Sequence, residues 1–186
     1  MKKVLTALTV SFCLLGVFYT SSFAQGFKNK VELSLAGSLQ AHVDDGEAIH
    51  FLNIPLRVGF FFTPGLELEA EAIVTVIDEV FSGDTEVGYI LSGNLSYNVK
   101  ATPLLTPFAL AGYGISNTQP LVNTGILGNA DFTMGVLNLG VGVKIGVGSK
   151  SAVRAEYRFQ NFTAGEPYDI DFQIHTFQFG LSIFLP

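Results

Sequence analysis

The sequence predicts an all-β fold, namely an eight-stranded antiparallel up-and-down transmembrane β-barrel. First, residues 56–62 and 66–72 alternate between apolar and polar side chains on both sides of a Thr-Pro-Gly turn, which is the period of a β-strand with two different faces. Second, 48% of the residues are hydrophobic, yet no apolar run after the N-terminal segment is long enough for a transmembrane helix. Third, segments that alternate between apolar and polar side chains recur along the chain, and the connections between them are alternately short and long.

The polar face of the segment 66–72 indicates which side of the barrel is inside. It carries Glu67, Glu69 and Glu71 in a chain with only 14% charged residues. Carboxylates on alternate residues cannot lie in an ordinary packed core without partners. They can line a narrow barrel whose apolar face contacts lipid, and this is the arrangement that we predict.

A soluble, lipocalin-like barrel with the two faces exchanged is the alternative, because periodicity alone does not say which face is inside. Two observations count against it. One face is almost continuously apolar, as in Leu137, Leu139, Val141, Val143, Ile145 and Val147. The other face is rich in Gly, Ser and Asn as well as charged residues, which suits a confined lumen better than a solvated exterior.

Residues 1–24 are typical of a cleaved secretory signal peptide. Lys2 and Lys3 precede a mostly apolar run, and Ser22-Phe23-Ala24 offers the small residues that cleavage requires. The apolar run is short for a membrane anchor. We therefore expect an exported protein in which residues 25–186 form one outer-membrane β-barrel domain.

The composition excludes several classes of function. Cys13 is the only cysteine and lies in the signal segment, so the mature chain has no disulfide, thiol nucleophile or thiolate metal site. Removal of the two positive charges of Lys2 and Lys3 takes the formal net charge from −6 to −8, which argues against nucleic acid as a partner. No motif supports catalysis, and Asp44-Asp45-Gly46-Glu47 lacks the ligand spacing of a calcium loop.

The expected strands are joined by two kinds of connection. The strands are 30–40, 51–62, 66–77, 87–99, 107–116, 132–147, 152–162 and 173–184. The tight turns are 63–65, 100–106 and 148–150, and the longer connections are 41–50, 78–86, 117–131 and 163–172. Strict alternation of the two kinds places the turns on the periplasmic side and the loops outside.

The strand 107–116 has two possible orientations. Either Phe108 and Leu110 face lipid, or Ala109, Ala111 and Tyr113 do.

The four long connections are acidic and contain no lysine or arginine. Their acidic residues are Asp44, Asp45, Glu47, Asp78, Glu79, Asp84, Glu86, Asp131, Glu166, Asp169 and Asp171. We therefore expect acidic extracellular loops. The segments 117–131 and 163–172 are the expected contact surfaces for an unidentified surface partner, because they are long and exposed.

Turn lengths predict the register of two hairpins. A three-residue loop at 63–65 places Arg57 opposite Glu71 and Phe61 opposite Glu67. A loop at 149–151 places Lys144 opposite Glu156. The alternative register sets Lys144 against Arg154, and we prefer the first because like charges directly opposite one another are destabilising.

The polar faces of the strands together predict an ion-paired lumen. The candidate residues are Glu32, Glu67, Glu69, Glu71 and Glu156 against Arg57, Lys144, Arg154 and Arg158. An eight-stranded barrel is just wide enough for side chains to fill its interior, so paired acids and bases would form a plug. The functional alternative is a proton or ion conduit through Glu67, Glu69 and Glu71.

Several stretches resemble the small outer-membrane β-barrel family, which includes the OmpA-like and OmpX-like membrane domains. The similar stretches are 57–68, 107–114, 138–144, 154–159 and 175–184. Leu185 departs from the family, which prefers an aromatic residue at the end of the last strand. The resemblance covers essentially the whole mature chain and implies a barrel in the outer membrane of a Gram-negative bacterium. It implies little about activity, since this fold is shared more widely than any one function.

These observations favour a non-enzymatic structural or interaction protein. We expect no cofactor and no metal. The expected partners are outer-membrane lipids and lipopolysaccharide, with a surface partner at the loops, and the expected state is a monomer because a closed barrel leaves no free strand edge. A narrow channel for ions or small apolar solutes is the first alternative. A lipid-modifying enzyme is the second, although neither His50 nor His175 has a convincing nucleophile beside it.

Overall fold

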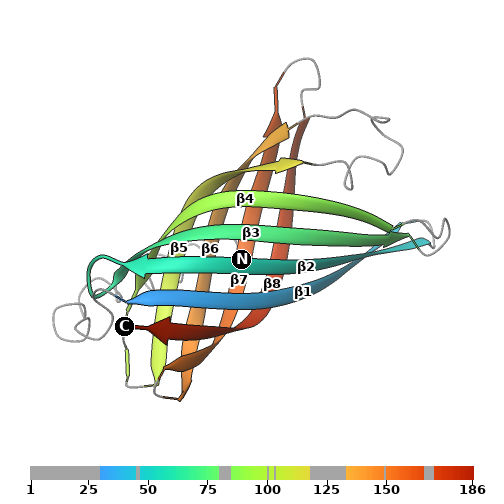
Figure 1. Ribbon diagram of the computed structural model, residues 1–186. Helices are drawn as coiled ribbons and strands as arrows, with labels where there is room; N and C mark the ends of the chain where they lie inside the picture. Colours follow the sequence, from blue (N-terminus) through green and yellow to red (C-terminus); the bar gives the residue numbers. More distant parts are fainter. Residues whose placement is uncertain are drawn as a thin grey trace, which may run out of the picture.

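A computed structural model describes residues 30–44, 47–79, 85–99, 101–102, 104–117, 133–148, 150–165 and 170–186. The expected signal peptide 1–24 lies outside these residues, as does most of the segment 117–131. The described part contains eight strands (Figure 1). They are β1 (Val31–Asp44), β2 (Glu47–Phe61), β3 (Leu66–Glu79), β4 (Thr85–Asn98), β5 (Leu105–Asn117), β6 (Thr133–Gly148), β7 (Ser151–Ala164) and β8 (Ile170–Leu185).

The eight strands form one closed antiparallel barrel. Each strand pairs with its neighbours in sequence, and β8 pairs back onto β1. The described residues include no helix that is long and apolar enough to cross a membrane. The predicted fold class, an eight-stranded antiparallel up-and-down barrel, is therefore confirmed.

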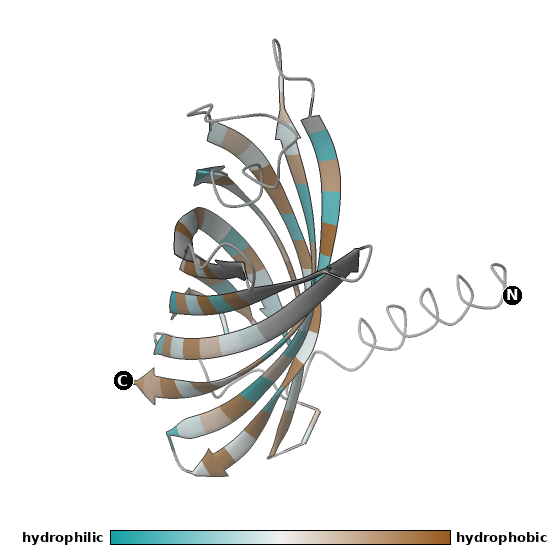
Figure 2. Cartoon of the chain, turned by 90° about the vertical axis from the view of Figure 1, so that its right-hand side faces the viewer, coloured by the Kyte–Doolittle hydropathy of each residue, from teal (hydrophilic) through white to brown (hydrophobic). Residues whose placement is uncertain are grey.

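The apolar side chains of the strands lie on the outside of the barrel. Hydrophobic and hydrophilic residues alternate along the strands (Figure 2), and most of the large hydrophobic side chains are exposed. Leu137, Leu139 and Val141 of β6, for example, are 43–56% exposed, whereas Asn138 between them is fully buried. A soluble, lipocalin-like barrel needs the apolar face inside, so that alternative is wrong.

The structure shows which side chains of β5 point into the lumen. Phe108 and Leu110 point into the barrel and are 4% and 5% exposed, while Ala109, Ala111 and Tyr113 face outward. The large inward side chains fit because glycines stand opposite them on β6, where Phe108 pairs with Gly142 and Leu110 with Gly140. The space that these glycines leave is what admits two bulky residues to a narrow lumen.

Several strands extend further than the sequence predicts. Every described residue of the predicted connections 41–50 and 78–86 is a strand residue. Asp44 pairs with Glu47 across β1 and β2, and Asp78 pairs with Thr85 across β3 and β4. Antiparallel pairing continues because it satisfies backbone hydrogen bonds whatever the side chains carry. Six of the predicted acidic loop residues are therefore strand residues, namely Asp44, Glu47, Asp78, Glu79, Glu86 and Asp171. Asp45, Asp84, Asp131, Glu166 and Asp169 lie outside the described residues.

The registers of the two predicted hairpins have different outcomes. Arg57 pairs with Glu71 and Phe61 with Glu67, as predicted. On the second hairpin the prediction is wrong, because Lys144 pairs with Arg154 and not with Glu156. A bulge between Gly146 and Gly148 shifts the register, and both cations find acidic partners on other strands, so their direct opposition is compensated.

The seam between β1 and β8 is shorter than the other strand pairings. It runs from Val31↔Leu185 to Gly37↔Phe179, and the described residues of the two strands form no further pair beyond this point. Residues 38–44 of β1 pair with β2, and residues 170–178 of β8 pair with β7. The two strands diverge accordingly (Figure 1). The barrel is therefore closed most firmly at the end of the tight turns.

Candidate functional site

The charged residues predicted for the lumen all lie on the inward faces of five strands. They are Glu32 on β1, Arg57 on β2, Glu67, Glu69 and Glu71 on β3, Lys144 on β6, and Arg154, Glu156 and Arg158 on β7. Each is 4% exposed or less. Nine ion pairs within 4.0 Å connect all nine residues into a single network. We call this set the lumen network.

Lys144 organises the part of the network nearest the tight turn at residues 62–65, which we call the turn end of the barrel. Its Nζ lies 2.5 Å from Glu32 Oε2 and 2.9 Å from Glu67 Oε2. The ammonium group also lies 5.3 Å from the ring centroids of both Phe61 and Phe108. Two carboxylates and two aromatic rings therefore surround a cation that has left water, and together they offset its desolvation.

Arg154 occupies the middle of the network and contacts three acids on three strands. Its Nε donates to Glu156 Oε2 at 3.0 Å, and its Nη2 donates to Glu69 Oε2 at 3.1 Å. Its Nη1 lies 3.6 Å from Glu32 Oε1, and its guanidinium stacks 4.4 Å from the Phe108 ring centroid. Arginine suits this position because its planar group donates in several directions while one face packs on an aromatic ring.

Two further arginines bind Glu71 at the other side of the network. Arg158 donates through Nη1 and Nη2 to the two oxygens of Glu71 at 2.9 and 3.1 Å, and through Nε to Glu156 at 2.5 Å. Arg57 donates to Glu71 and to the side-chain oxygen of Gln178. The paired, two-oxygen contact fixes geometry as well as charge, so Glu71 is held from two strands at once.

Apolar layers lie above and below the lumen network. At the turn end, Phe61, Ala152 and Phe184 form a buried cluster. Toward the opposite, loop end the inward residues form a second apolar cluster, comprising Ile73, Ile90, Met134, Val136 and Phe162. The charges are thus confined to a middle layer of the lumen with packed hydrocarbon on both sides.

Glycines provide the room that the long side chains need. A β-carbon at position 59 would overlap the carboxylate of Glu67, and one at position 142 would come within 2.7 Å of the Phe108 ring atom Cε1. Side chains larger than hydrogen at these positions would therefore push on the network. The pairing of an inward glycine with a long neighbour is how this narrow barrel accommodates nine charged residues.

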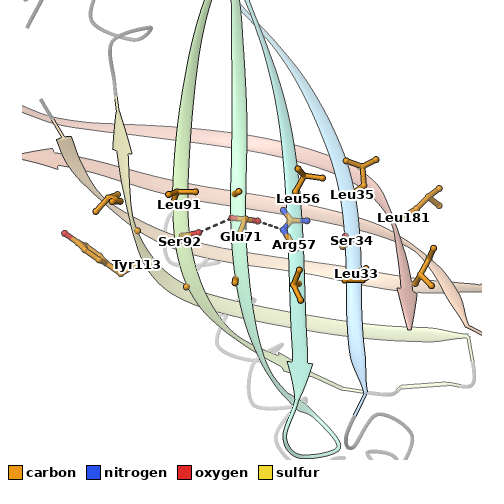
Figure 3. A pocket seen from close by; sticks show the side chains of 17 residues that line it. Leu33, Ser34, Leu35, Leu56, Arg57, Glu71, Leu91, Ser92, Tyr113 and Leu181 are labelled. Atoms are coloured by element: carbon orange, nitrogen blue, oxygen red, sulfur yellow. Dashed lines mark hydrogen bonds and ion pairs between the residues drawn. The ribbon is translucent and has the colours of Figure 1, made fainter. Parts of the chain in front are cut away.

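The outer wall carries a shallow groove with a volume of about 1120 Å³. It crosses the wall over β8, β1, β2, β3, β4 and β5, and Leu91, Leu56, Leu35 and Leu181 mark its course (Figure 3). The hydrogen bonds from Ser92 and Arg57 to Glu71 lie directly behind it (Figure 3). The groove is a feature that sequence reasoning missed, because it requires the register of six strands to be known.

The described residues contain no group of three or more His, Cys, Asp or Glu side chains placed to hold a metal ion. His175 faces outward, where its Nδ1 lies 2.6 Å from the Tyr157 hydroxyl. Thr176 is 2% exposed and faces inward, so these two neighbours point to opposite sides of the wall. His175 and Thr176 therefore do not form a nucleophile pair.

Sequence reasoning also missed several uncharged members of the site. Gln178 and Ser92 contact the network as hydrogen-bond partners, and Phe108 contacts it through two cations. Alternation along β8 and β4 places Gln178 and Ser92 on the polar face. Ser92 lies directly opposite Glu71 on the next strand, so its contact follows from the register of β3 and β4. Gln178 contacts Arg57, which is far away in the sequence, so only the closed barrel identifies that contact.

The comparisons with known proteins agree with this architecture. The fold and its apolar outer face define a membrane-spanning eight-stranded barrel. The sequence matches the family described as "Outer membrane protein beta-barrel domain" over residues 10–183, and the chain belongs to this family. No curated protein matches it significantly.

Solved structures show the same fold at low sequence identity. The N-terminal β-barrel domain of Pseudomonas aeruginosa OprF has a TM-score of 0.54 at 18% identity, covering 85% of this chain and 98% of that one. Neisserial surface protein A has a TM-score of 0.56 at 14% identity, covering 83% and 95%. A de novo designed transmembrane β-barrel has a TM-score of 0.51 at 13% identity, covering 85% and 97%.

Proposed function

We propose that this protein is a structural barrel of the Gram-negative outer membrane whose lumen does not conduct, and that it acts through its position in the membrane and its acidic loop end. The observation that carries the proposal is the lumen network, in which nine buried charges are mutually paired between two apolar layers. An ion crossing this layer would have to displace pairs that already compensate one another.

The paired state of the β3 glutamates argues against the conduit alternative. Glu67 is bound by Lys144, Glu69 by Arg154, and Glu71 by Arg57 and Arg158. A relay through carboxylates needs groups that can exchange protons or ions with one another. Here each carboxylate faces a cation, and breaking one pair leaves an uncompensated buried charge.

We also propose a location and partners for the barrel. Residues 1–24 direct export, the outward apolar face contacts outer-membrane lipid and lipopolysaccharide, and the protein acts as a monomer without catalysis, cofactor or metal. The acidic residues of the loops, among them the exposed Asp171 at the loop end, offer a surface for a partner outside the cell. Family membership and the alternation of faces support this placement.

Deletion and complementation in the source bacterium test the proposal. If the barrel has a structural role, loss of the protein should make cells more sensitive to detergent and large antibiotics, while uptake of small solutes should be unchanged. Complementation with the wild-type chain should restore resistance. Slower uptake of a small ion or apolar solute in the deletion strain, with an intact permeability barrier, would instead support the conduit. Altered lipid A masses would support the enzyme alternative.

A further inference from the structure

The groove on the outer wall is built from two rows of outward residues that follow the hydrogen-bonding direction of the sheet. One row is Leu181, Leu35, Leu56, Ala72, Leu91 and Ile115, and the other is Ile183, Leu33, Val58, Ala70, Gly93 and Tyr113. Each residue is the direct cross-strand partner of the next in its row. Because strands of such barrels tilt by roughly 35–45°, the rows run obliquely across the membrane.

The floor of the groove lies on β3 and β4, where three of the four outward lining residues, Ala70, Ala72 and Gly93, are small. Ala70 and Ala72 of β3 pair with Gly93 and Leu91 of β4. A β-carbon at Gly93 would meet no atom within 4 Å, so the space above this residue is open. On one side the floor is bounded by Leu56 and Val58, and on the other by Tyr113 and Ile115, all 49–61% exposed.

Arg57 and Glu71 are among the residues that line the groove, but their charged groups are not exposed in it. Both residues are 4% exposed or less and are paired with each other inside the lumen. The outward side chains that line the groove are apolar apart from the Tyr113 hydroxyl. The groove therefore offers contacts to hydrocarbon and no charged contact to a headgroup.

We propose that this groove is a fixed binding site for a hydrocarbon chain of an outer-membrane lipid. The occupant follows from continuity, since the groove is part of the same exposed apolar face that contacts lipid around the barrel. Within a membrane, apolar surface gains little from burial alone, so selective retention has to come from packing. A chain in a concave groove touches protein on more sides than a chain on a convex wall, and these dispersion contacts add up.

Filling the groove from its floor tests the proposal. Gly93→Phe places a ring in the open space, and Ala70→Leu fills the neighbouring position. Ala111→Phe is the matched control, because Ala111 also faces outward but lies outside the groove lining. The full-length mature protein is refolded in mixed phospholipid, extracted into mild detergent, and examined by native mass spectrometry for bound phospholipid and oligomeric state.

The expected result is that the wild-type barrel and Ala111→Phe retain lipid adducts through detergent washing. Gly93→Phe should lower adduct occupancy about tenfold, which is about 1.4 kcal/mol, and Ala70→Leu should lower it in the same direction. Retention that is equal in all four proteins, or absent from the wild type, would overturn the proposal. A dimer that Gly93→Phe converts to a monomer would overturn it in favour of a second copy of this chain in the groove.

Discussion

Lys144 and Arg154 lie directly opposite each other on β6 and β7, yet each is neutralised by acids on other strands. Lys144 binds Glu32 on β1 and Glu67 on β3. Arg154 contacts Glu32 and Glu69 on the same two strands, and also Glu156 on its own strand. In a narrow lumen the long side chains reach across the barrel, so the neighbour on the adjacent strand is not the partner that matters most. The pairing energy of the lumen therefore belongs to the network as a whole.

Arg154→Ala tests that statement. Removal of this guanidinium leaves Glu32, Glu69 and Glu156 with one partner fewer, and we expect a loss of about 3–5 kcal/mol in the free energy of unfolding. Urea unfolding of the refolded protein in micelles measures it. Lys150→Ala is the control, because Lys150 is exposed near a turn and its removal should cost less than about 0.5 kcal/mol. Equal losses in the two variants would show that the network is not critical.

Replacement by alanine should have different effects on stability at two glycines. Gly59→Ala places a methyl group where the Glu67 carboxylate lies, and we expect a destabilisation of about 1–3 kcal/mol from overpacking. Gly93→Ala places it in open space and should be neutral or stabilising by up to about 1 kcal/mol. The urea unfolding midpoints of the two variants measure these changes in stability. An unchanged midpoint for Gly59→Ala would mean that Glu67 has room to move.

Phe108→Leu should weaken the middle of the lumen network. The ring lies against both Lys144 and Arg154, and each cation–π contact contributes about 0.5–2 kcal/mol. Phe177→Leu is the comparison, since Phe177 is 68% exposed on the lipid side, where lipid replaces the lost contacts. The measured quantity is the free energy of unfolding in lipid vesicles. A larger effect of Phe177→Leu would contradict the expectation.

Hydrogen exchange should be uneven along β8. Residues 179–183 lie where β8 pairs with both β7 and β1, whereas residues 170–178 pair with β7 alone among the described residues. Amides without a strand partner exchange faster because no local opening is required. Peptide-level exchange measured by mass spectrometry should therefore show faster labelling in 170–178. Uniform protection along β8 would mean that the seam closes further than Gly37 and Phe179.

Much of this arrangement follows from local pattern, and the exceptions have physical reasons. Alternation placed Glu67, Glu69 and Glu71 on one face, and a short turn set Arg57 opposite Glu71, because both depend only on nearby residues. The register of Lys144 could not be predicted from neighbouring charges, since a bulge moved it and distant acids compensated it.

The extent of the strands at the loop end could not be predicted either. Polar and acidic residues such as Asp44 and Glu47 are typical of loops, yet they continue the β1–β2 ladder. Backbone pairing determines where these strands end, and side-chain composition carries little information about the position of the ends. The groove likewise depends on six strands being in register, and small residues such as Ala70 and Gly93 give no signal alone.

Single-channel conductance in a planar bilayer shows whether the paired charges close the lumen. The purified, refolded protein is inserted, and insertion is verified independently by protection from protease. A closed lumen should leave the membrane silent with the wild type, whereas a variant such as Arg154→Ala, which breaks the lumen network, should give openings. Stable openings of the wild-type protein would contradict this expectation, because an ion path would then exist past Arg154 and its three glutamates.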